Sequence, residues 1–360
     1  MGMIKVLGLA LYGPLAASNR YRLAQYKDGL HKHNISLEVH HLLDDNYLKN
    51  QFSGKKNSYF SLIKLAWKRV YMLLTKHNYD LIILHCELMP MIPAFLEKML
   101  LRRPYIYDFD DAFFLRYKQG SLKKLNFFLG DKFDSILSSA VAINAGNDYL
   151  MQYAKKINKN TNFFPTVVDT TRYYVGHYKK STIFTIGWIG SPSTSEYLED
   201  MIIPLSELGK KIPILLLVIG GSAPQIENIT VQSLPWSEDQ EISLINQFDV
   251  GIMPLPDTDW ARGKCAFKLL QYMACGLPVV ASKVGANIDV VNANVGFLAH
   301  DTASWISALT QLYENPSLRK KLGSNGRALV EKKYSLSANL PILVEVIQNA
   351  VKYDVKNTVN

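Results

Sequence analysis

"FDVGIMPLPDTDWARGKCAFKLLQYMACGLPVVAS" (residues 248–282) contains two short apolar runs separated by a segment of helical pattern. The runs 248–255 and 277–282 have the length and composition of buried strands. Gly276 can end the helix in a left-handed conformation, and Pro278 prevents its continuation. A strand, a helix and a second strand in this order predict a unit of parallel sheet covered by helices.

The same alternation extends along the whole chain and predicts an α/β fold. Between its two series of strands, residues 165–182 lack periodicity and predict a linker. We therefore expect two Rossmann-like, doubly wound domains facing a central cleft, at 1–170 and 171–340. A C-terminal helix and tail, 341–360, can pack back on the first domain. The apolar runs of the first series are 4–11, 36–42, 81–86, 105–109 and 139–144, and those of the second are 184–190, 213–220, 248–255 and 277–282.

Composition and cysteine content restrict the class of protein. With 360 residues, 48% hydrophobic and 20% charged, the chain is long enough for two globular domains with real cores. No apolar run reaches the roughly 18 to 20 residues that cross a bilayer. The three cysteines are odd in number and lack metal-site spacing, so we expect a reducing compartment, with the cytoplasm as the default.

The positive charge lies entirely in the first half of the chain. Residues 1–170 hold 23 Lys and Arg against 14 Asp and Glu, whereas the remainder holds 17 of each. Residues 60–77 form a basic amphipathic helix pattern, and 116–133 are again basic and aromatic. Such segments are typical of proteins at anionic membrane surfaces, although an ordinary surface helix with a solvated basic face is the alternative. Nucleic acid is not expected, because no recognition motif accompanies the charge. The apolar arc comprises Phe60, Ile63, Trp67, Val70 and Leu74, and the cations outside it are Lys64, Lys68, Arg69 and Lys76.

Three cations stand at the front of the helix in the opening stretch. At about 100° per residue, Lys264, Lys268 and Gln271 share one helix face, and Arg262 precedes them. The helix dipole disfavours cations at this end, so we expect an anion of diphosphate size to offset them. The alternative is a solvated face with the long side chains pointing apart.

A second anion-binding feature follows the run at 184–190. There "IGWIGSPSTSEYLEDMI" (186–202) turns from a strand into a helix, leaving backbone N–H groups free for a ligand. The third glycine of the dinucleotide fingerprint is missing, so a dinucleotide is not expected. The candidate anion-binding residues of this turn are Gly190, Ser191, Ser193 and Thr194.

Polar side chains also follow the strands of the first half, at the edge where parallel sheets bind ligands. Three carboxylates within four residues, in "YDFDD" (107–111), are difficult to explain by packing, because acids are rarely buried unpaired. They can orient a hydroxyl group of a ligand, or they can be salt-bridge partners of Arg20 and Arg22, with His85 in the core. The candidate ligand-binding residues at this edge are Arg20, Arg22, His85, Glu87, Asp108, Asp110 and Asp111.

The residues 248–282, together with "GWIGSPSTSEYL", "YDFDDAFF" and "INAGNDYLMQYA", resemble the retaining GT-B glycosyltransferases, a group that includes many bacterial lipopolysaccharide and capsule enzymes. The resemblance implies transfer of a sugar from a nucleoside diphosphate donor, of UDP or GDP type, to a glycan or lipid-linked acceptor. It also implies that neither a metal nor another cofactor is needed, and that the protein acts in the cytoplasm, peripherally at the inner membrane face. A non-catalytic nucleotide-sugar-binding subunit and a nucleotide-sugar epimerase are the alternatives.

The resemblance implies that the residues of the glycine-serine turn bind the donor and that the polar residues after the strands of the first half bind the acceptor. It also suggests roles for single residues. Lys268 matches the lysine that contacts the donor phosphates, supplemented by Lys264 and Arg262, and Asp110 lies where many relatives have a histidine near the reacting carbon. These roles make Lys268 and Asp110 the catalytic candidates.

Two further positions concern the nucleoside. Gln271 replaces the second glutamate of the family's Glu-x7-Glu motif, and Gly263 replaces the first. Trp236, in "LPWSED" (234–239), matches the loop where the base rests, although a buried structural role is equally compatible with the residue.

Overall fold

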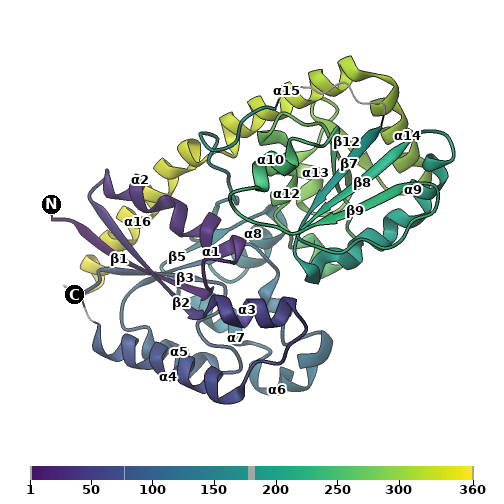
Figure 1. The fold of residues 1–360 in the computed structure, drawn as a ribbon. Coiled ribbons are helices and arrows are strands. Elements are labelled where there is room, and N and C mark those ends of the chain that lie inside the picture. Colours follow the sequence, from purple (N-terminus) through teal and green to yellow (C-terminus); the bar gives the residue numbers. More distant parts are fainter. Residues whose placement is uncertain (1, 77, 177–182, 359–360) are drawn as a thin grey trace. The chain divides into compact units, whose positions relative to one another are not determined.

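The computed structural model describes residues 2–76, 78–176 and 183–358, with the backbone alone for 353–358. The chain forms two compact units, which are treated separately below (Figure 1). The first unit comprises Met1–Val167 and Leu336–Asn360, and the second comprises Val168–Ser335. The unit boundary precedes the expected one at 170, because Val168 already pairs with the second unit: its N–H donates to the carbonyl of Tyr334 at 3.1 Å.

The first unit contains a six-stranded parallel sheet in the order β2-β1-β3-β4-β5-β6. Its register places Leu9 of β1 beside His40 of β2 and Leu84 of β3. Helices cover a parallel sheet on both faces, which explains why the central strands are continuous apolar runs. The strands are β1 (Ile4–Tyr12), β2 (Ile35–Leu43), β3 (Leu81–His85), β4 (Tyr105–Phe109), β5 (Ala142–Ala145) and β6 (Thr161–Phe163).

The last helix of the chain, α16, completes the first unit. It begins at Leu336 rather than at the expected 341, with Pro341 inside it, and Leu343 and Ile347 join the core around Val6. The other helices are α1 (Ala17–Arg22), α2 (Lys27–His31), α3 (Asp45–Phe52), α4 (Tyr59–Thr75), α5 (Ala94–Leu100), α6 (Asn126–Leu129), α7 (Lys132–Ser139) and α8 (Asp148–Lys155), and α16 spans Leu336–Thr358. Short 3-10 segments are η1 (Ala24–Tyr26), η2 (Phe113–Leu115) and η3 (Gly120–Leu125).

The second unit repeats the plan, with a parallel sheet in the order β12-β11-β10-β7-β8-β9. Gly187 of β7 pairs with Gly251 of β10 at its centre. A side chain at either position would collide with the ring of Phe248 or Tyr272, so the two glycines make room for these aromatic residues. The strands are β7 (Phe184–Ile189), β8 (Ile214–Ile219), β9 (Thr230–Leu234), β10 (Val250–Met253), β11 (Val279–Ser282) and β12 (Gly296–Ala299).

The helices of the second unit pack on both faces of this sheet (Figure 1). Arg327 of α15 connects the end of α12 to the segment that precedes β7. Its Nη1 donates to the carbonyls of Ala274 at 2.6 Å and Tyr173 at 2.7 Å. These helices are η4 (Pro192–Met201, 3-10), α9 (Ile202–Gly209), α10 (Glu241–Ile245), α11 (Asp259–Arg262), α12 (Phe267–Ala274), α13 (Ala286–Val290), α14 (Thr302–Glu314) and α15 (Pro316–Lys333).

Among the described residues, no helix has both the length and the apolar character that crossing a membrane requires. No disulfide joins Cys86, Cys265 and Cys275, all of which lie in the described part of the chain.

Candidate functional site

The turn after β7 forms one side of the candidate donor site in the second unit. Gly190 follows the strand, and η4 begins at Pro192. The hydroxyl of Ser191 lies 2.8 Å from that of Ser193, and the hydroxyl of Thr194 donates to the carbonyl of Ser191 at 3.1 Å. The turn therefore presents a compact group of small polar side chains.

Lys268 of α12 lies against this turn. Its ammonium is 4.0 Å from the ring centroid of Trp188 and donates to the Thr194 hydroxyl at 3.4 Å. A Cβ atom at Gly190 would lie 2.7 Å from Lys268 Nζ and 2.4 Å from the Trp188 ring, so only glycine leaves space for this approach. The lysine and the glycine-serine turn, which the sequence analysis identified separately, are therefore in contact in the structure.

The electrostatic state of Lys268 is unusual. Burial of the ammonium, and secondarily the charge of Lys264, lower the pKa of Lys268 to about 7. No carboxylate lies within ion-pair distance of Lys268 among the residues that the structure describes. A cation that the protein itself does not neutralise is suited to bind an anion.

The front of α12 differs from the sequence prediction. The helix begins at Phe267, preceded by Ala266 in a left-handed conformation (φ 54°), so Lys264 lies in the preceding loop rather than on the helix face. Arg262 ends the separate helix α11, and its guanidinium binds Asp257 at 2.7 and 3.1 Å. Lys268 and Lys264 remain close enough to interact, whereas Arg262 is held by its own carboxylate partner, which the helical-wheel argument did not include.

Gln271 is buried in a hydrogen-bonded group around Glu241. Its amide donates to the Glu241 carboxylate at 2.8 Å and to the Tyr173 hydroxyl at 2.9 Å. Tyr173 and Trp236 donate to the same carboxylate at 2.6 and 2.7 Å. A glutamate at position 271 would place two carboxylates in contact here, which explains in physical terms why an amide occupies it.

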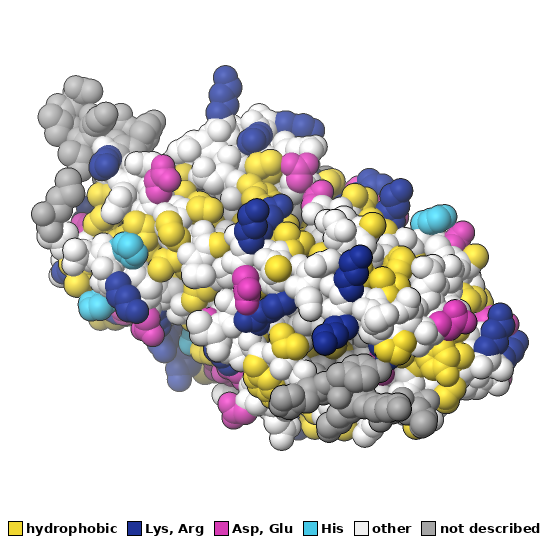
Figure 2. Space-filling view, turned by 90° about the horizontal axis from the view of Figure 1, so that it is seen from above, with side chains coloured by type: hydrophobic (Ala, Val, Ile, Leu, Met, Phe, Trp, Pro, Cys, Tyr) yellow, Lys and Arg dark blue, Asp and Glu magenta, His cyan; other side chains and the backbone are white. Residues whose placement is uncertain are grey.

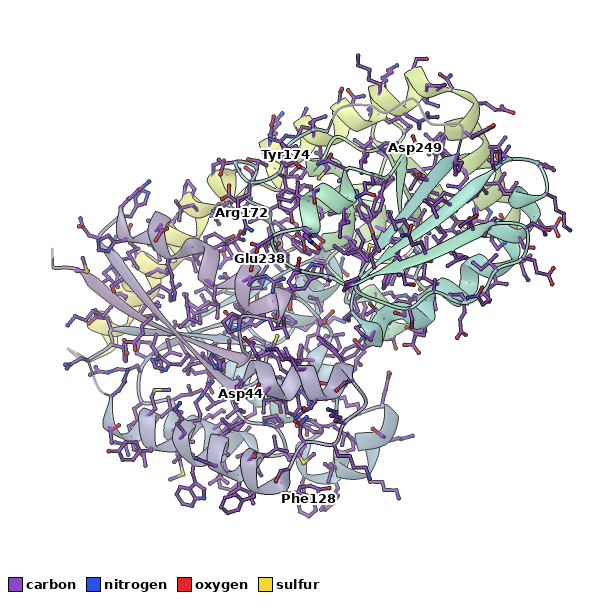
Figure 3. All side chains as sticks on the ribbon, in the orientation of Figure 1. Asp44, Phe128, Arg172, Tyr174, Glu238 and Asp249 are labelled. Atoms are coloured by element: carbon purple, nitrogen blue, oxygen red, sulfur yellow. The ribbon has the colours of Figure 1, made fainter. Side chains whose placement is uncertain are left out.

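Trp236 lies beside the turn, in the loop after β9. A Cβ atom at Gly220 would be 2.9 Å from Trp236 and 2.7 Å from the carbonyl of Gly190, so the ends of β7 and β8 and this loop meet closely. The indole is half-buried, with its nitrogen bound to Glu241. The neighbouring Glu238 pairs with Arg172 at 3.1 Å (Figure 3).

In the first unit, Arg22 and Asp108 form a buried ion pair. Arg22 donates through Nε and Nη2 to the two Asp108 oxygens at 2.9 and 2.6 Å, and through Nη1 to the carbonyl of Phe164 at 2.7 Å. Burial raises the pKa of Asp108, but the Arg22 charge and the His85 hydrogen bond outweigh it and lower the pKa below its usual value. Of the two alternatives for this carboxylate, the structure shows the salt bridge. Arg20 donates to the carbonyls of Pro14 and Leu15.

His85 connects this ion pair to Cys86 and Asp110. Its Nδ1 lies 2.8 Å from Asp108, and its Nε2 lies 3.2 Å from Cys86 Sγ and 3.7 Å from Asp110. Burial and the surrounding carboxylates raise the pKa of the Cys86 thiol well above its usual value. His85, Cys86 and Asp110 have ligand atoms close enough to hold a metal ion, although hydrogen bonds within the group already use these atoms. Asp110 and Asp111 are half-buried at the end of β4.

Glu87 belongs to a second buried cluster. Its carboxylate binds Lys132 at 2.7 Å, Tyr117 at 2.7 Å and Arg116 at 3.0 Å. Lys132 also binds Glu97 at 2.9 Å. Burial is the main reason why the pKa of Glu97 is raised to about 7. These contacts neutralise Glu87 within the protein.

Three residues that organise these clusters were missed from the sequence. Trp188 contacts Lys268, and its indole nitrogen is buried without a hydrogen-bond partner among the described residues. Glu241 organises Gln271 and Trp236, and Lys132 neutralises Glu87 and Glu97. The tryptophan in "GWIG" was visible as an unusual residue before a glycine turn, whereas the pairing of Glu241 and Lys132 with distant residues left no local signal.

Comparison with known proteins relates this geometry to a family. The model of the glycosyl transferases group 1 matches residues 180–315, which run from β7 to α14 and include Lys268 and the glycine-serine turn. Sucrose-phosphate synthase from Thermosynechococcus elongatus shares the fold, with a TM-score of 0.72 over 96% of this chain and 98% of that chain. The chain has the GT-B fold. The fold class expected from the sequence is thereby confirmed, and the family match agrees with the resemblance seen in the sequence.

Other GT-B structures agree, at low sequence identity. Anabaena HepE, solved with UDP and glucose, is 17% identical, with a TM-score of 0.66 over 96% of this chain and all of that chain. WaaG, a glycosyltransferase involved in lipopolysaccharide biosynthesis, is 14% identical, with a TM-score of 0.68 over 96% and 99%; sucrose-phosphate synthase is likewise 14% identical. None of the curated protein sequences compared with this GT-B chain matches it. The family model and the fold together support a glycosyltransferase of the GT-B type.

Proposed function

We propose that this protein transfers a sugar from a nucleoside diphosphate sugar, of UDP or GDP type, to a glycan or lipid-linked acceptor with retention of the anomeric configuration. The observation that carries the proposal is Lys268, a cation of lowered pKa without a carboxylate partner, placed against Gly190 and Thr194. It lies within the segment that matches the glycosyl transferases group 1. HepE, a protein of the same fold, has been solved with UDP-glucose.

Lys268 neutralises the leaving diphosphate in this proposal, so no metal ion is required at the donor. The ammonium and the N–H groups of the glycine-serine turn stabilise the charge that develops on the leaving group. Lys264 adds positive potential at the donor site. Arg262 supports the site indirectly, because its ion pair with Asp257 holds the loop before α12. Ser191, Ser193 and Thr194 donate hydrogen bonds to phosphate oxygens.

The nucleoside lies against the loop after β9. Trp236 stacks on the base, because its half-buried ring adjoins the turn at Gly190 and Gly220. Gln271 takes the place of the ribose-binding glutamate and is oriented by Glu241.

The acceptor binds the first unit, at the ends of β3 and β4. Asp110 orients the acceptor hydroxyl or stabilises the oxocarbenium-like centre. His85 and Asp108 hold that region in place through their mutual hydrogen bond, and Arg22 neutralises Asp108. Asp111 and Arg20 complete the acceptor surface, and the buried Glu87 supports it from beneath.

The decisive experiment measures donor binding and donor hydrolysis. We expect UDP or GDP to raise the melting temperature, and Lys268→Ala to lose about 1.5 to 3 kcal/mol of diphosphate affinity, the range of a charge-assisted hydrogen bond. We expect EDTA to leave turnover unchanged and NMR to show product with the donor's anomeric configuration. Unchanged UDP and GDP affinity in Lys268→Ala would contradict the assignment.

A matched variant in the other unit separates chemistry from donor binding. Asp110→Asn keeps the shape of the side chain and removes its charge, so we expect turnover to fall by far more than donor affinity. An equal loss of both quantities would identify Asp110 as a structural residue.

A non-catalytic nucleotide-sugar-binding subunit is the second candidate. It is favoured by the loss of both glutamates of the Glu-x7-Glu motif, at Gly263 and Gln271. This candidate predicts nucleotide binding without turnover for any donor, with or without acceptor. Donor hydrolysis that disappears in Lys268→Ala, while the fold is retained, would exclude it.

The proposed place of action is the inner face of the membrane, with the protein peripherally bound in the cytoplasm. The basic first half of the chain and the absence of disulfides among its three cysteines support this location. A lipid-linked acceptor for lipopolysaccharide or capsule synthesis would be met at that surface.

A further inference from the structure

Helix α4 turns its apolar side outward. Phe60, Ile63, Trp67, Tyr71 and Leu74 follow one another at spacings of three or four residues and therefore lie on one helix face. They are 41% to 79% exposed. An amphipathic surface helix usually buries such a face against the core, whereas α4 leaves it exposed.

Arg69 fixes the helix in this orientation. It lies on the opposite side of α4, is 3% exposed, and donates through Nη2 to the carbonyls of Ala10 at 2.9 Å and His40 at 3.3 Å. Leu73 is buried on the same side. Arg69 thus faces the sheet, whereas the aromatic residues of α4 face outward.

Neighbouring elements extend the apolar surface. On α5, which packs beside α4, Phe95 and Met99 are 64% and 69% exposed. On α6, Phe127 and Phe128 are 89% and 76% exposed. Phe128 projects from the lower edge of the first unit in Figure 3, the side on which Figure 1 shows α4 and α5. We call these exposed residues of α4, α5 and α6 the apolar face. Large exposed patches of this kind mark interaction sites.

The charge around the apolar face has one sign. Residues 46–79 contain seven Lys and Arg and no Asp or Glu, and residues 112–130 contain four and none. Lys64 and Lys68 are exposed on α4, as are Lys123 and Lys124 ahead of α6. The carboxylate of α5, Glu97, points inward to Lys132. The view in Figure 2, by contrast, shows acidic, basic and hydrophobic side chains interspersed.

We propose that the apolar face inserts into the interfacial region of an anionic lipid bilayer, with Trp67 and the phenylalanines among the lipid headgroups and the lysines against lipid phosphates. Aromatic side chains favour that depth, and basic flanks favour anionic lipid over neutral lipid. The uniform positive charge selects this occupant over a second copy of the chain, whose equal charge would repel it. The inference deepens the proposed function by naming the surface at which a lipid-linked acceptor is met.

Binding to lipid vesicles tests the inference without any donor. We expect sedimentation with vesicles of phosphatidylcholine and phosphatidylglycerol in equal parts, and at least tenfold weaker binding to pure phosphatidylcholine. Trp67 emission should shift to shorter wavelength on binding, and Trp67→Phe should remove the shift, because the other four tryptophans all lie in the second unit.

Paired variants locate the contact. Phe60→Ser with Trp67→Ser, and separately Lys64→Glu with Lys68→Glu, should each weaken vesicle binding at least tenfold. Ile203→Ser is the matched control, since Ile203 of α9 is 65% exposed on the second unit. Circular dichroism checks that each variant is folded, and UDP or GDP affinity should be unchanged in all of them, which separates this inference from the donor assignment.

Two outcomes would overturn the inference. One is equal binding of wild type and the apolar-face variants to anionic vesicles. The other is a dimer in size-exclusion chromatography that Phe60→Ser with Trp67→Ser converts to monomer, because the face would then be covered by a second copy.

Discussion

Two lysines, one in each unit, show how the same side chain takes on different roles. Lys132 of the first unit is surrounded by the carboxylates of Glu87 and Glu97 and the carbonyl of Met89, all within 2.9 Å. Lys268 of the second unit has a hydroxyl at 3.4 Å and the ring of Trp188, with no carboxylate within ion-pair distance among the described residues. Both ammonium groups lose water, but only one regains a full set of partners.

The difference indicates which unit needs a ligand to complete its electrostatics. A buried cation with two carboxylates is satisfied and stabilises the position of the elements that it joins. A desolvated cation beside a glycine turn costs stability until an anion arrives. The first cluster is therefore structural, and the second site is prepared for a ligand.

The largest expected effect is that of Lys132→Met. Removing the ammonium leaves two buried carboxylates without their cation, so we expect the free energy of unfolding to fall by about 3 to 5 kcal/mol. Urea unfolding followed by circular dichroism measures it, with the exposed Lys155→Met as a control that should stay within about 0.5 kcal/mol of wild type. A loss below 1 kcal/mol would remove the contrast between the two lysines.

Lys268→Met should have the opposite effect on stability. We expect diphosphate affinity to fall by about 1.5 to 3 kcal/mol, while the free energy of unfolding without ligand rises by about 1 kcal/mol. Because the pKa of Lys268 is lowered on folding, the unfolded chain binds more protons between pH 7 and about 10.4, so the gain should shrink as pH rises through that range. Calorimetry and thermal unfolding measure the two quantities, and a destabilised variant would indicate that Lys268 has a structural role.

The lowered pKa of Lys268 also predicts how diphosphate binding depends on pH. Above pH 7 the lysine is neutral without ligand and must take up a proton to bind, so affinity should fall up to tenfold per pH unit, about 1.4 kcal/mol. The phosphate itself, with a pKa of about 6, is fully ionised in this range. Calorimetry from pH 7 to 9 should show the slope in wild type, and its persistence in Lys268→Met would assign it to another group.

The fold was largely predictable because the central strands are buried on both faces. Such strands are continuous apolar runs, and the strand at 105–109 was predicted with its correct first and last residues. Three of the four edge strands, β6, β9 and β12, were not identified, whereas the edge strand β2 was. The signal is weakest in β9, which has no buried residue, and in β6, which has one. The start of α12 was misplaced because the left-handed Ala266 has no signature in the sequence.

The candidate site was predictable where it depends on local sequence. Lys268 and the glycine-serine turn were each identified from the residues around them. Arg262 was misjudged because Asp257 competes for it, and Arg69 was misjudged because a helical pattern does not show which face meets the sheet. Pairing between residues far apart, such as Lys132 with Glu97, depends on tertiary structure.

Gln271 provides the smallest and most specific test of the contrast between a satisfied and an unsatisfied group. Gln271→Glu would restore the residue type of related enzymes but bring a second carboxylate to within about 3 Å of Glu241, so we expect a loss of about 1 to 2 kcal/mol of stability. The exchanged pair Glu241→Gln with Gln271→Glu again has one carboxylate and one amide, and should recover most of that loss in a double-mutant cycle. If Gln271→Glu alone is as stable as wild type, Glu241 is not the reason for the amide. The replacement of the family glutamate would then have to be explained by the donor itself.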